Sequence, residues 1–140
     1  MIGVVLVTHG NLGKELLSTA AFIVGDIPAT AALSITGSES ADEIRERMSA
    51  AITSVDGDSD GVIVLTDMFG GTPANVALSF LDERRVEVIT GVNLPMVLKL
   101  SNARSGGKTL FEAAQDLAVT GQRNIIFASD LLGKQDRDRK

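Results

Sequence analysis

The sequence predicts an α/β fold in which a doubly wound, mainly parallel sheet carries helices on both faces. Two observations predict this class. Short β-branched runs alternate along the chain with longer stretches of helical period, which is typical of a parallel sheet covered by helices. The chain has 140 residues, of which 44% are hydrophobic, enough for one substantial core. We therefore expect one domain over residues 1–133 and a mixed-charge tail over 134–140 that frays.

The first half of the chain predicts three strands separated by two helices. The strands are expected at about 2–8, 31–36 and 61–66. The first helix starts near Asn11 and ends at Gly25, where a left-handed cap is expected. Its predicted inward stripe consists of Leu12, Leu16, Thr19, Ala20, Ile23 and Val24. A capping box, Ser40 to Glu43, opens the second helix, whose inward residues are Ile44, Met48, Ala51, Ile52 and Val55.

The second half continues the same alternation. Thr72 is expected to cap a helix with Pro73 at its first position, continued by Ala74, Ala77, Phe80 and Leu81. A fourth strand is predicted at 86–90, and Pro95 suits the start of a helix that reaches about residue 103. A second capping box, Thr109 to Glu112, opens a helix that ends near Gly121. Residues 124–129 predict a last, short strand.

The composition excludes several classes of function. Acidic residues outnumber basic ones by 18 to 13 without a basic cluster, so a nucleic-acid partner is not expected. The absence of cysteine excludes a thiolate nucleophile or a cysteine zinc site and fits a reducing compartment. No apolar run approaches the roughly 20 residues of a membrane span. The glycines match neither a Walker A loop nor a Rossmann fingerprint, and one histidine does not suffice for a metal hydrolase, so no cofactor and no metal are expected.

Reactive side chains follow two of the predicted strands. His9, the only histidine, follows the first strand, and Asp67 follows the third. Ligands of open α/β sheets bind beyond the carboxyl ends of the strands, where the strand order reverses. With the order 2-1-3-4 the two strands are neighbours at that reversal. The sequence therefore predicts that His9 and Asp67 face each other.

This pair suits phosphoryl transfer through the histidine. An imidazole attacks phosphorus through an unprotonated nitrogen, which an ordinary pKa of about 6.5 supplies near neutrality. A carboxylate on the other nitrogen would fix the tautomer and steady the cationic character of the ring. Gly70 and Gly71 would let backbone N–H groups at a helix start approach the phosphoryl oxygens, and the Thr72 hydroxyl would donate a further hydrogen bond.

Plainer interpretations of each residue stay open at this point. A lone histidine is more often a surface or core residue than a nucleophile, and Asp67 could only cap its own turn. The run 70–73 could be an ordinary strand-to-helix connection. A receiver domain would need an acidic pair where Thr8 and His9 stand. The placement of His9 between a strand and a helix start, together with Asp67, favours the phosphoryl acceptor.

At these residues the sequence resembles the IIA component of the mannose/fructose/sorbose family of the bacterial phosphoenolpyruvate-dependent sugar phosphotransferase system. The likeness covers nearly the whole chain. The tripeptide Thr8 to Gly10 resembles the phosphorylation motif, residues 67–73 (DMFGGTP) the site loop, and residues 91–96 (GVNLPM) a third signature. Thr8, Gly10 and Asn93 would support the site from within these motifs.

The resemblance implies a cytoplasmic phosphotransferase relay. His9 would accept phosphate from the phosphocarrier protein HPr and pass it to a histidine of a IIB protein, which acts with the membrane components IIC and IID. Asp67 would orient His9, and Thr72 would contact the phosphoryl group. The chain is too short to hold a fused IIB domain, so we expect a separate IIB partner. The family also implies a homodimer in which residues 124–129 cross to the partner's sheet.

Two alternatives remain beside transport. The phosphorylation state of His9 could report carbon supply to a regulated protein without any sugar being carried. The phosphotransfer subunit of dihydroxyacetone kinase is related in fold, although its site loop is usually less like Gly-Gly-Thr-Pro. Phosphate that reaches His9 but never leaves to IIB would favour regulation.

Overall fold

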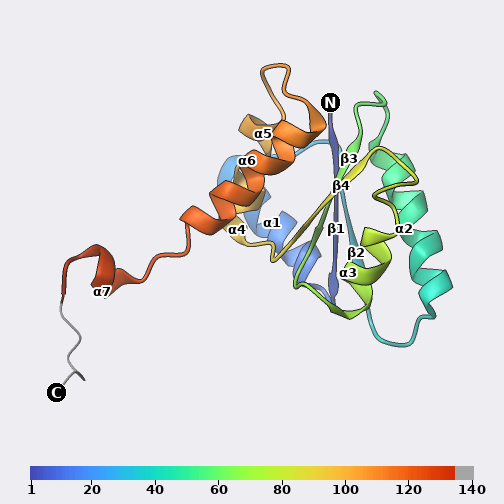
Figure 1. The fold of residues 1–140 in the computed structure, drawn as a ribbon, viewed down its shortest axis with the longest axis horizontal. Helices are drawn as coiled ribbons and strands as arrows, with labels where there is room; N and C mark the ends of the chain where they lie inside the picture. Colours follow the sequence, from blue (N-terminus) through green and yellow to red (C-terminus); the bar gives the residue numbers. More distant parts are fainter. Residues whose placement is uncertain (135–140) are drawn as a thin grey trace.

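A four-stranded parallel sheet forms the centre of the protein, as the computed structural model, which describes residues 1–134, shows (Figure 1). The strand order is β2-β1-β3-β4, which confirms the predicted 2-1-3-4. The strands are β1 (Gly3–His9), β2 (Thr30–Ile35), β3 (Val62–Thr66) and β4 (Val86–Thr90). In the register, Val7 of β1 lies opposite Thr66 of β3, so β1 and β3 end at the same edge of the sheet.

Residues 1–134 form seven helices, six of which cover the two faces of the sheet. They are α1 (Leu12–Val24), α2 (Ala41–Val55), α3 (Gly71–Leu78), α4 (Leu94–Leu98), α5 (Leu100–Ala103), α6 (Leu110–Arg123) and α7 (Ala128–Leu131). Helices α2 and α3 lie on one face, and α1 and α4 to α6 lie on the other (Figure 1). None of the helices in this part of the chain is both long and apolar enough to cross a membrane.

The core consists of two apolar layers that share the sheet. Alternate residues of a strand point to opposite faces, so Leu6 packs with α1, α4 and α6 while Val5 and Val7 pack with α2 and α3. All five residues predicted to face inward from α2 are buried. Burial of the central strands β1 and β3 on both faces explains why their sequences are continuous apolar runs.

The predicted helix starts are formed by side-chain caps. The Ser40 hydroxyl accepts a hydrogen bond from the backbone N–H of Glu43 at 3.1 Å. Thr109 and Glu112 form a complete capping box, in which each side chain accepts from the other residue's backbone N–H. Gly25 does end α1, with a φ of 86° that glycine adopts readily, although its ψ of −170° is extended rather than left-handed helical.

The predicted inward stripe of α1 is only partly right. Ala20 is buried and Leu16 packs on the core, whereas Leu12, Ile23 and Val24 are exposed. The contact with the sheet is centred on Gly13 and Ala20. A Cβ on Gly13 would lie 3.2 Å from Cβ of Leu6 and 3.3 Å from Oγ1 of Thr8. The helix therefore approaches β1 through its small residues, which a stripe chosen for large apolar side chains does not identify.

Two other helices differ from their predictions. The helix expected up to residue 103 is divided into α4 and α5 at Lys99. Helix α3 begins at Gly71 with Gly70 as its N-cap, so Thr72 does not cap it and Pro73 is not its first residue. Glycines at 70 and 71 allow positive φ values of 84° and 78°, and these let the chain turn into the helix without a side-chain cap. The helix ends at Leu78, before Phe80 and Leu81.

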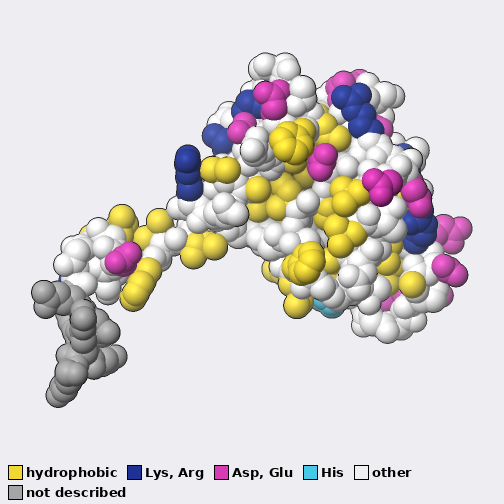
Figure 2. All heavy atoms as spheres, viewed as in Figure 1, with side chains coloured by type: hydrophobic (Ala, Val, Ile, Leu, Met, Phe, Trp, Pro, Cys, Tyr) yellow, Lys and Arg dark blue, Asp and Glu magenta, His cyan; other side chains and the backbone are white. Residues whose placement is uncertain are grey.

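The last predicted strand is not formed within the chain. Asn124 ends α6 in a turn, and residues 125–127 lead without regular secondary structure into the short helix α7, which stands away from the sheet (Figure 1). A strand needs a neighbour for its backbone hydrogen bonds, and this segment pairs with no strand of residues 1–134. Its apolar side chains are exposed, and Figure 2 shows them along the projecting arm. Of the predicted frayed tail, residues 135–140 lie outside the described part.

Candidate functional site

His9 and Asp67 meet at the carboxyl edge of the sheet, as predicted. His9 is the last residue of β1, and Asp67 directly follows β3. The Oδ2 atom of Asp67 lies 2.8 Å from Nδ1 of the His9 ring and also accepts the backbone N–H of His9 at 3.0 Å. Because one oxygen holds both the backbone and the ring of His9, the direction of the imidazole is fixed.

The two side chains differ in their access to solvent. The His9 side chain is 53% exposed, while that of Asp67 is 12% exposed. Burial raises the pKa of the Asp67 carboxyl, but the hydrogen bonds from the backbone and ring of His9 outweigh burial and hold this pKa below its usual value. Asp67 is therefore a carboxylate at neutral pH, with its Oδ1 atom buried and without a hydrogen-bond partner among residues 1–134.

The carboxylate sets the tautomer of His9. An ionised carboxylate only accepts hydrogen bonds, so Nδ1 must carry the proton in the 2.8 Å contact. The lone pair of the neutral ring is then on Nε2. This nitrogen points towards Gly71, where an added Cβ would lie 3.6 Å from Nε2 and 3.4 Å from Cε1. The nitrogen with the free lone pair therefore faces the N-terminus of α3.

Helix α3 offers backbone donors beside this nitrogen. The first turn of a helix has N–H groups without partners and the positive end of the dipole, both of which favour an anion. Glycine at 71 keeps the approach to Nε2 free of a side chain. Thr72 is exposed in the same turn and, having no capping role, keeps its hydroxyl available. The three residues predicted to bind phosphate thus stand together next to His9.

Thr8 fixes the start of α1 behind the histidine. Its side chain is fully buried, and its hydroxyl accepts the backbone N–H of Gly13 at 2.8 Å. Asn11, the N-cap residue, makes no such bond to the helix, and its side chain accepts instead from Ser34. Gly10 has a φ of 56° and donates its N–H to the Ile35 carbonyl at 2.8 Å. These contacts hold the turn that carries His9.

Replacement of Thr8 by valine is expected to destabilise the fold by about 1 kcal/mol, because the N–H of Gly13 loses its acceptor without a change of volume. Urea unfolding followed by circular dichroism measures this difference. Thr19→Val is the matched control, since Thr19 is exposed on α1, the helix whose start Thr8 holds. Equal unfolding midpoints for the two variants would show that the Thr8 hydroxyl does not stabilise the fold.

Sequence reasoning missed one residue of the site, Thr66. Thr66 is buried directly before Asp67, and its carbonyl accepts the N–H groups of Gly91 and Val92. Buried threonines thus precede both His9 and Asp67, a parallel that the sequence does display. The Asn93 amide instead bridges α4 and α6: it accepts from the N–H of Met96 at 3.1 Å and donates to the Gly121 carbonyl at 3.0 Å.

An apolar rim lies beside the site. Met68 and Phe69 follow Asp67 in the chain, and their side chains are 53% and 77% exposed. Large apolar side chains this exposed, next to a reactive group, commonly mark a surface for a protein partner. Within residues 1–134, no group of three His, Cys, Asp or Glu side chains is arranged to hold a metal ion.

The fold and the site together define a class: doubly wound α/β proteins with an exposed histidine held by a buried carboxylate at the switch point of the sheet. Comparison with known proteins is more specific. The family of the "PTS system fructose IIA component" matches residues 3–119. The chain therefore belongs to the IIA components of the mannose/fructose family of the sugar phosphotransferase system, which confirms the resemblance.

Individual relatives agree with this family. The mannose-specific EIIAB component of Escherichia coli (strain K12) is 30% identical over 125 residues, covering 89% of this chain, and the chain spans 38% of that protein. The fructose-specific EIIA component of Bacillus subtilis (strain 168) is 28% identical over 135 residues, which are 96% of this chain and 91% of that one. The EIIA structure from Streptococcus agalactiae superposes with a TM-score of 0.84 at 24% identity, covers 93% and 99% of the two chains, and shows the same fold.

Proposed function

We propose that the protein is a cytoplasmic phosphocarrier that accepts a phosphoryl group on Nε2 of His9 from HPr and transfers it to a IIB protein during sugar uptake. One observation carries this proposal. The ring of His9 is half exposed, while its other nitrogen is held at 2.8 Å by the Asp67 carboxylate, which is only 12% exposed. Membership in the family of IIA components supports the same function and gives the expected donor and acceptor.

The transfer step needs no base. The Nε2 lone pair of His9 attacks the phosphorus of the donor's phosphohistidine, an N–P bond forms, and the donor's N–P bond breaks with its electron pair returning to the donor imidazole. The proton on Nδ1 of His9 stays in place, and the Asp67 carboxylate stabilises the positive charge that the ring gains. Backbone N–H groups at the start of α3 and the Thr72 hydroxyl would receive the phosphoryl oxygens. Transfer to IIB is the reverse of these events.

The apolar rim gives the partners a place to dock. HPr and IIB must both bring a histidine to Nε2 of His9, so they would use the same face in turn. Met68 and Phe69 directly follow Asp67 in the chain and are exposed. Burying their side chains against a partner would contribute to the free energy of binding. Association through IIB would connect the protein to the membrane components IIC and IID.

A reconstituted relay tests this function. The protein is mixed with phosphoenolpyruvate, enzyme I and HPr, and phosphate on it is measured by intact mass under conditions that preserve phosphohistidine. Purified IIB is then added. We expect the label to reach the protein and then to leave for IIB. Label that reaches His9 but is never passed to IIB would contradict the transport role and favour the regulatory alternative.

Gly71→Ala is expected to slow phosphorylation by about tenfold or more, because the new methyl group would stand 3.6 Å from the attacking nitrogen, where phosphorus must approach. Gly70→Ala is the matched control: its φ is also positive, but its Cβ would meet no atom within 4 Å. The rate of label uptake from phosphorylated HPr measures both variants. If the two slow equally, backbone strain rather than access to Nε2 is responsible.

The extended C-terminal arm supports a homodimer as part of this proposal. Strand β4 is the edge of the sheet and has one side without a partner strand, and residues 125–127 lie in no helix and pair with no strand within residues 1–134. Exposed apolar side chains line the arm, namely Ile125, Ile126, Phe127, Leu131 and Leu132. Pairing of one subunit's arm with the other's β4 would satisfy both sets of backbone groups.

Phe127→Asp is expected to shift the protein from dimer to monomer, because a charge would replace a side chain that is 76% exposed in the single chain and buried by the exchange. Light scattering over a concentration series measures the change. Phe111→Asp, at a phenylalanine that is 64% exposed on α6, serves as control and should remain dimeric. A monomeric unmodified protein would contradict the exchange.

A further inference from the structure

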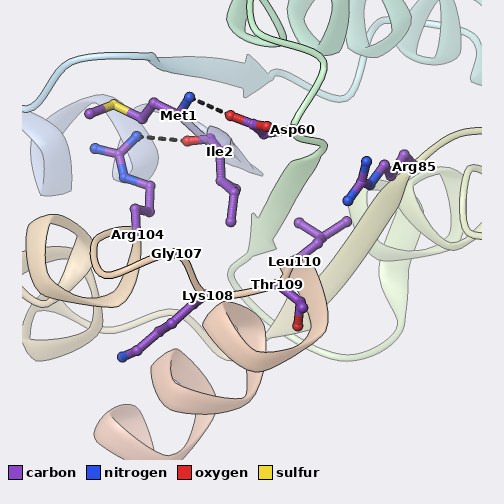
Figure 3. Close-up of a pocket in the computed structure, with 9 residues that line it drawn as sticks. All are labelled: Met1, Ile2, Asp60, Arg85, Arg104, Gly107, Lys108, Thr109 and Leu110. Carbon is purple, nitrogen blue, oxygen red and sulfur yellow. Dashed lines mark hydrogen bonds and ion pairs between the residues drawn. The ribbon is translucent and has the colours of Figure 1, made fainter.

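A second polar cavity lies at the opposite end of the sheet from His9. It has a volume of about 310 Å³ and is lined by residues that include Ile2, Asp60, Arg85, Arg104, Lys108 and Leu110 (Figure 3). These residues come from the amino ends of β1, β3 and β4 and from the loop before α6. Strand β1 separates the cavity from His9 by roughly 20 Å, given about 3.3 Å per residue. The cavity is therefore distinct from the phosphoryl-transfer site.

Arg104 carries a charge that no carboxylate of residues 1–134 balances. Its guanidinium donates only to neutral groups, the carbonyl of Ile2 at 3.0 Å and that of Leu100 at 3.3 Å. Burial lowers the pKa of Arg104, since the charged form has lost part of its hydration. Charges that have lost part of their hydration are ordinarily paired, so this half-buried guanidinium is suited to receive an anion.

Arg85 adds a second free cation on the other side of the cavity. It makes no hydrogen bond through its side chain and no ion pair with any residue in the described part of the chain. In Figure 3 its guanidinium is directed towards Leu110. The other charges of the cavity are already paired: Lys108 contacts Asp116, and Asp60 contacts the amine of Met1 at 2.6 Å. Two arginines without a carboxylate partner at one cavity are unexpected in a chain with a net charge of −5.

The lining also indicates which kind of anion fits. Guanidinium groups bind phosphate oxygens through paired N–H donors, and two of them match the charge of a phosphate dianion. The volume lies at the lower end of the range for small-molecule sites, about 300 to 1,000 Å³. Ile2 and Leu110 supply an apolar wall next to the arginines. We propose that this cavity binds the phosphate group of a small metabolite between Arg85 and Arg104.

Titration of the ¹⁵N-labelled full chain with glycerol 3-phosphate at constant ionic strength tests the site. We expect saturable shifts in the backbone signals of residue 2 and residues 107–110 and in the Nε signals of the two arginines. Inorganic phosphate is the second probe and glycerol the uncharged control. Tighter binding of the ester identifies a phosphorylated metabolite, and equal affinity identifies free phosphate; both support the site. Shifts confined to residues 70–72 would place binding at His9 alone and overturn the proposal.

Variants distinguish specific binding at this cavity from non-specific attraction of an anion to positive charge on the surface. Arg85→Gln is expected to weaken binding about tenfold, the loss of one charge-assisted contact. Arg104→Lys keeps the positive charge but loses the planar set of N–H donors, so it should weaken binding as well. Arg123→Gln is the control, because Arg123 is exposed at the far end of α6. Equal weakening by Arg123→Gln, or unchanged binding by Arg85→Gln, would overturn the site. The spectra themselves report whether each variant is folded.

Discussion

Replacement of His9 by alanine is expected to abolish phosphoryl uptake from HPr to below detection. The chain has one histidine and no cysteine, so no second side chain can replace the ring as an uncharged nitrogen or sulfur nucleophile. The remainder of the site would persist, because the backbone N–H that donates to Asp67 belongs to residue 9 whatever its side chain. Intact-mass measurement after incubation with phosphoenolpyruvate, enzyme I and HPr checks this result.

The stability of the variant must be measured as well, because the His9 ring donates a hydrogen bond to the largely buried carboxylate of Asp67. Loss of the ring removes one of the two hydrogen bonds to Oδ2 of Asp67, and we expect a stability loss of about 1 to 2 kcal/mol by urea unfolding. His9→Gln is the second variant, since its amide retains a donor and still cannot form a phosphoramidate of imidazole. Normal labelling of either variant would contradict the mechanism.

The position of the label on the ring tests the geometry independently. Because Asp67 holds Nδ1, the phosphoryl group is expected on Nε2. NMR of ¹⁵N-histidine-labelled, phosphorylated protein distinguishes the two nitrogens. A label on Nδ1 would mean that the contact with Asp67 breaks before transfer, and the orienting role of the carboxylate would then be lost.

The arrangement of the site could be predicted from sequence because it depends on topology. Once the strand order 2-1-3-4 is inferred, the residues that follow β1 and β3 must be neighbours, and these are His9 and Asp67. The capping box at Thr109 was equally predictable, since it is local in the chain. Features fixed by the order of elements or by a few adjacent residues are thus accessible without coordinates.

The features that were missed depend on how side chains and backbones of distant elements pack together. The bond from Gly13 to Thr8 arises because α1 approaches β1 through glycine, a distance that hydrophobic periodicity does not report. Asn93 was assigned to the site from its motif, yet its amide is occupied between α4 and α6. The strand predicted at 124–129 has the composition of a strand, but within residues 1–134 no strand pairs with it. Side-chain contacts between elements that are distant in the chain cannot be predicted from local sequence patterns.

Asp67→Asn is expected to slow transfer through His9 by up to about 10⁴, the loss seen when a carboxylate that orients a catalytic histidine becomes an amide. The amide oxygen can still accept from Nδ1–H, so the shape of the site is kept. It carries no charge, however, and does not stabilise the cationic ring that forms with the bond to phosphorus. Rapid-quench measurement of label uptake from phosphorylated HPr gives the rate, and Asp42→Asn, at an exposed residue of α2, is the control.

The same variant shows how the stability of the protein depends on pH. The pKa of Asp67 is lower in the folded protein than the usual value of about 3.9, so its carboxylate contributes stability above that value and loses it as the pH falls through the folded pKa. The difference in unfolding free energy between the unmodified protein and Asp67→Asn should therefore be constant from about pH 5 to 8 and shrink below about pH 4.

Since His9 provides both hydrogen bonds to Oδ2, a His9→Ala, Asp67→Asn double variant should lose less stability than the sum of the two single losses. Additive losses would show that the two side chains act separately, and an unchanged transfer rate in Asp67→Asn would remove the carboxylate from the mechanism.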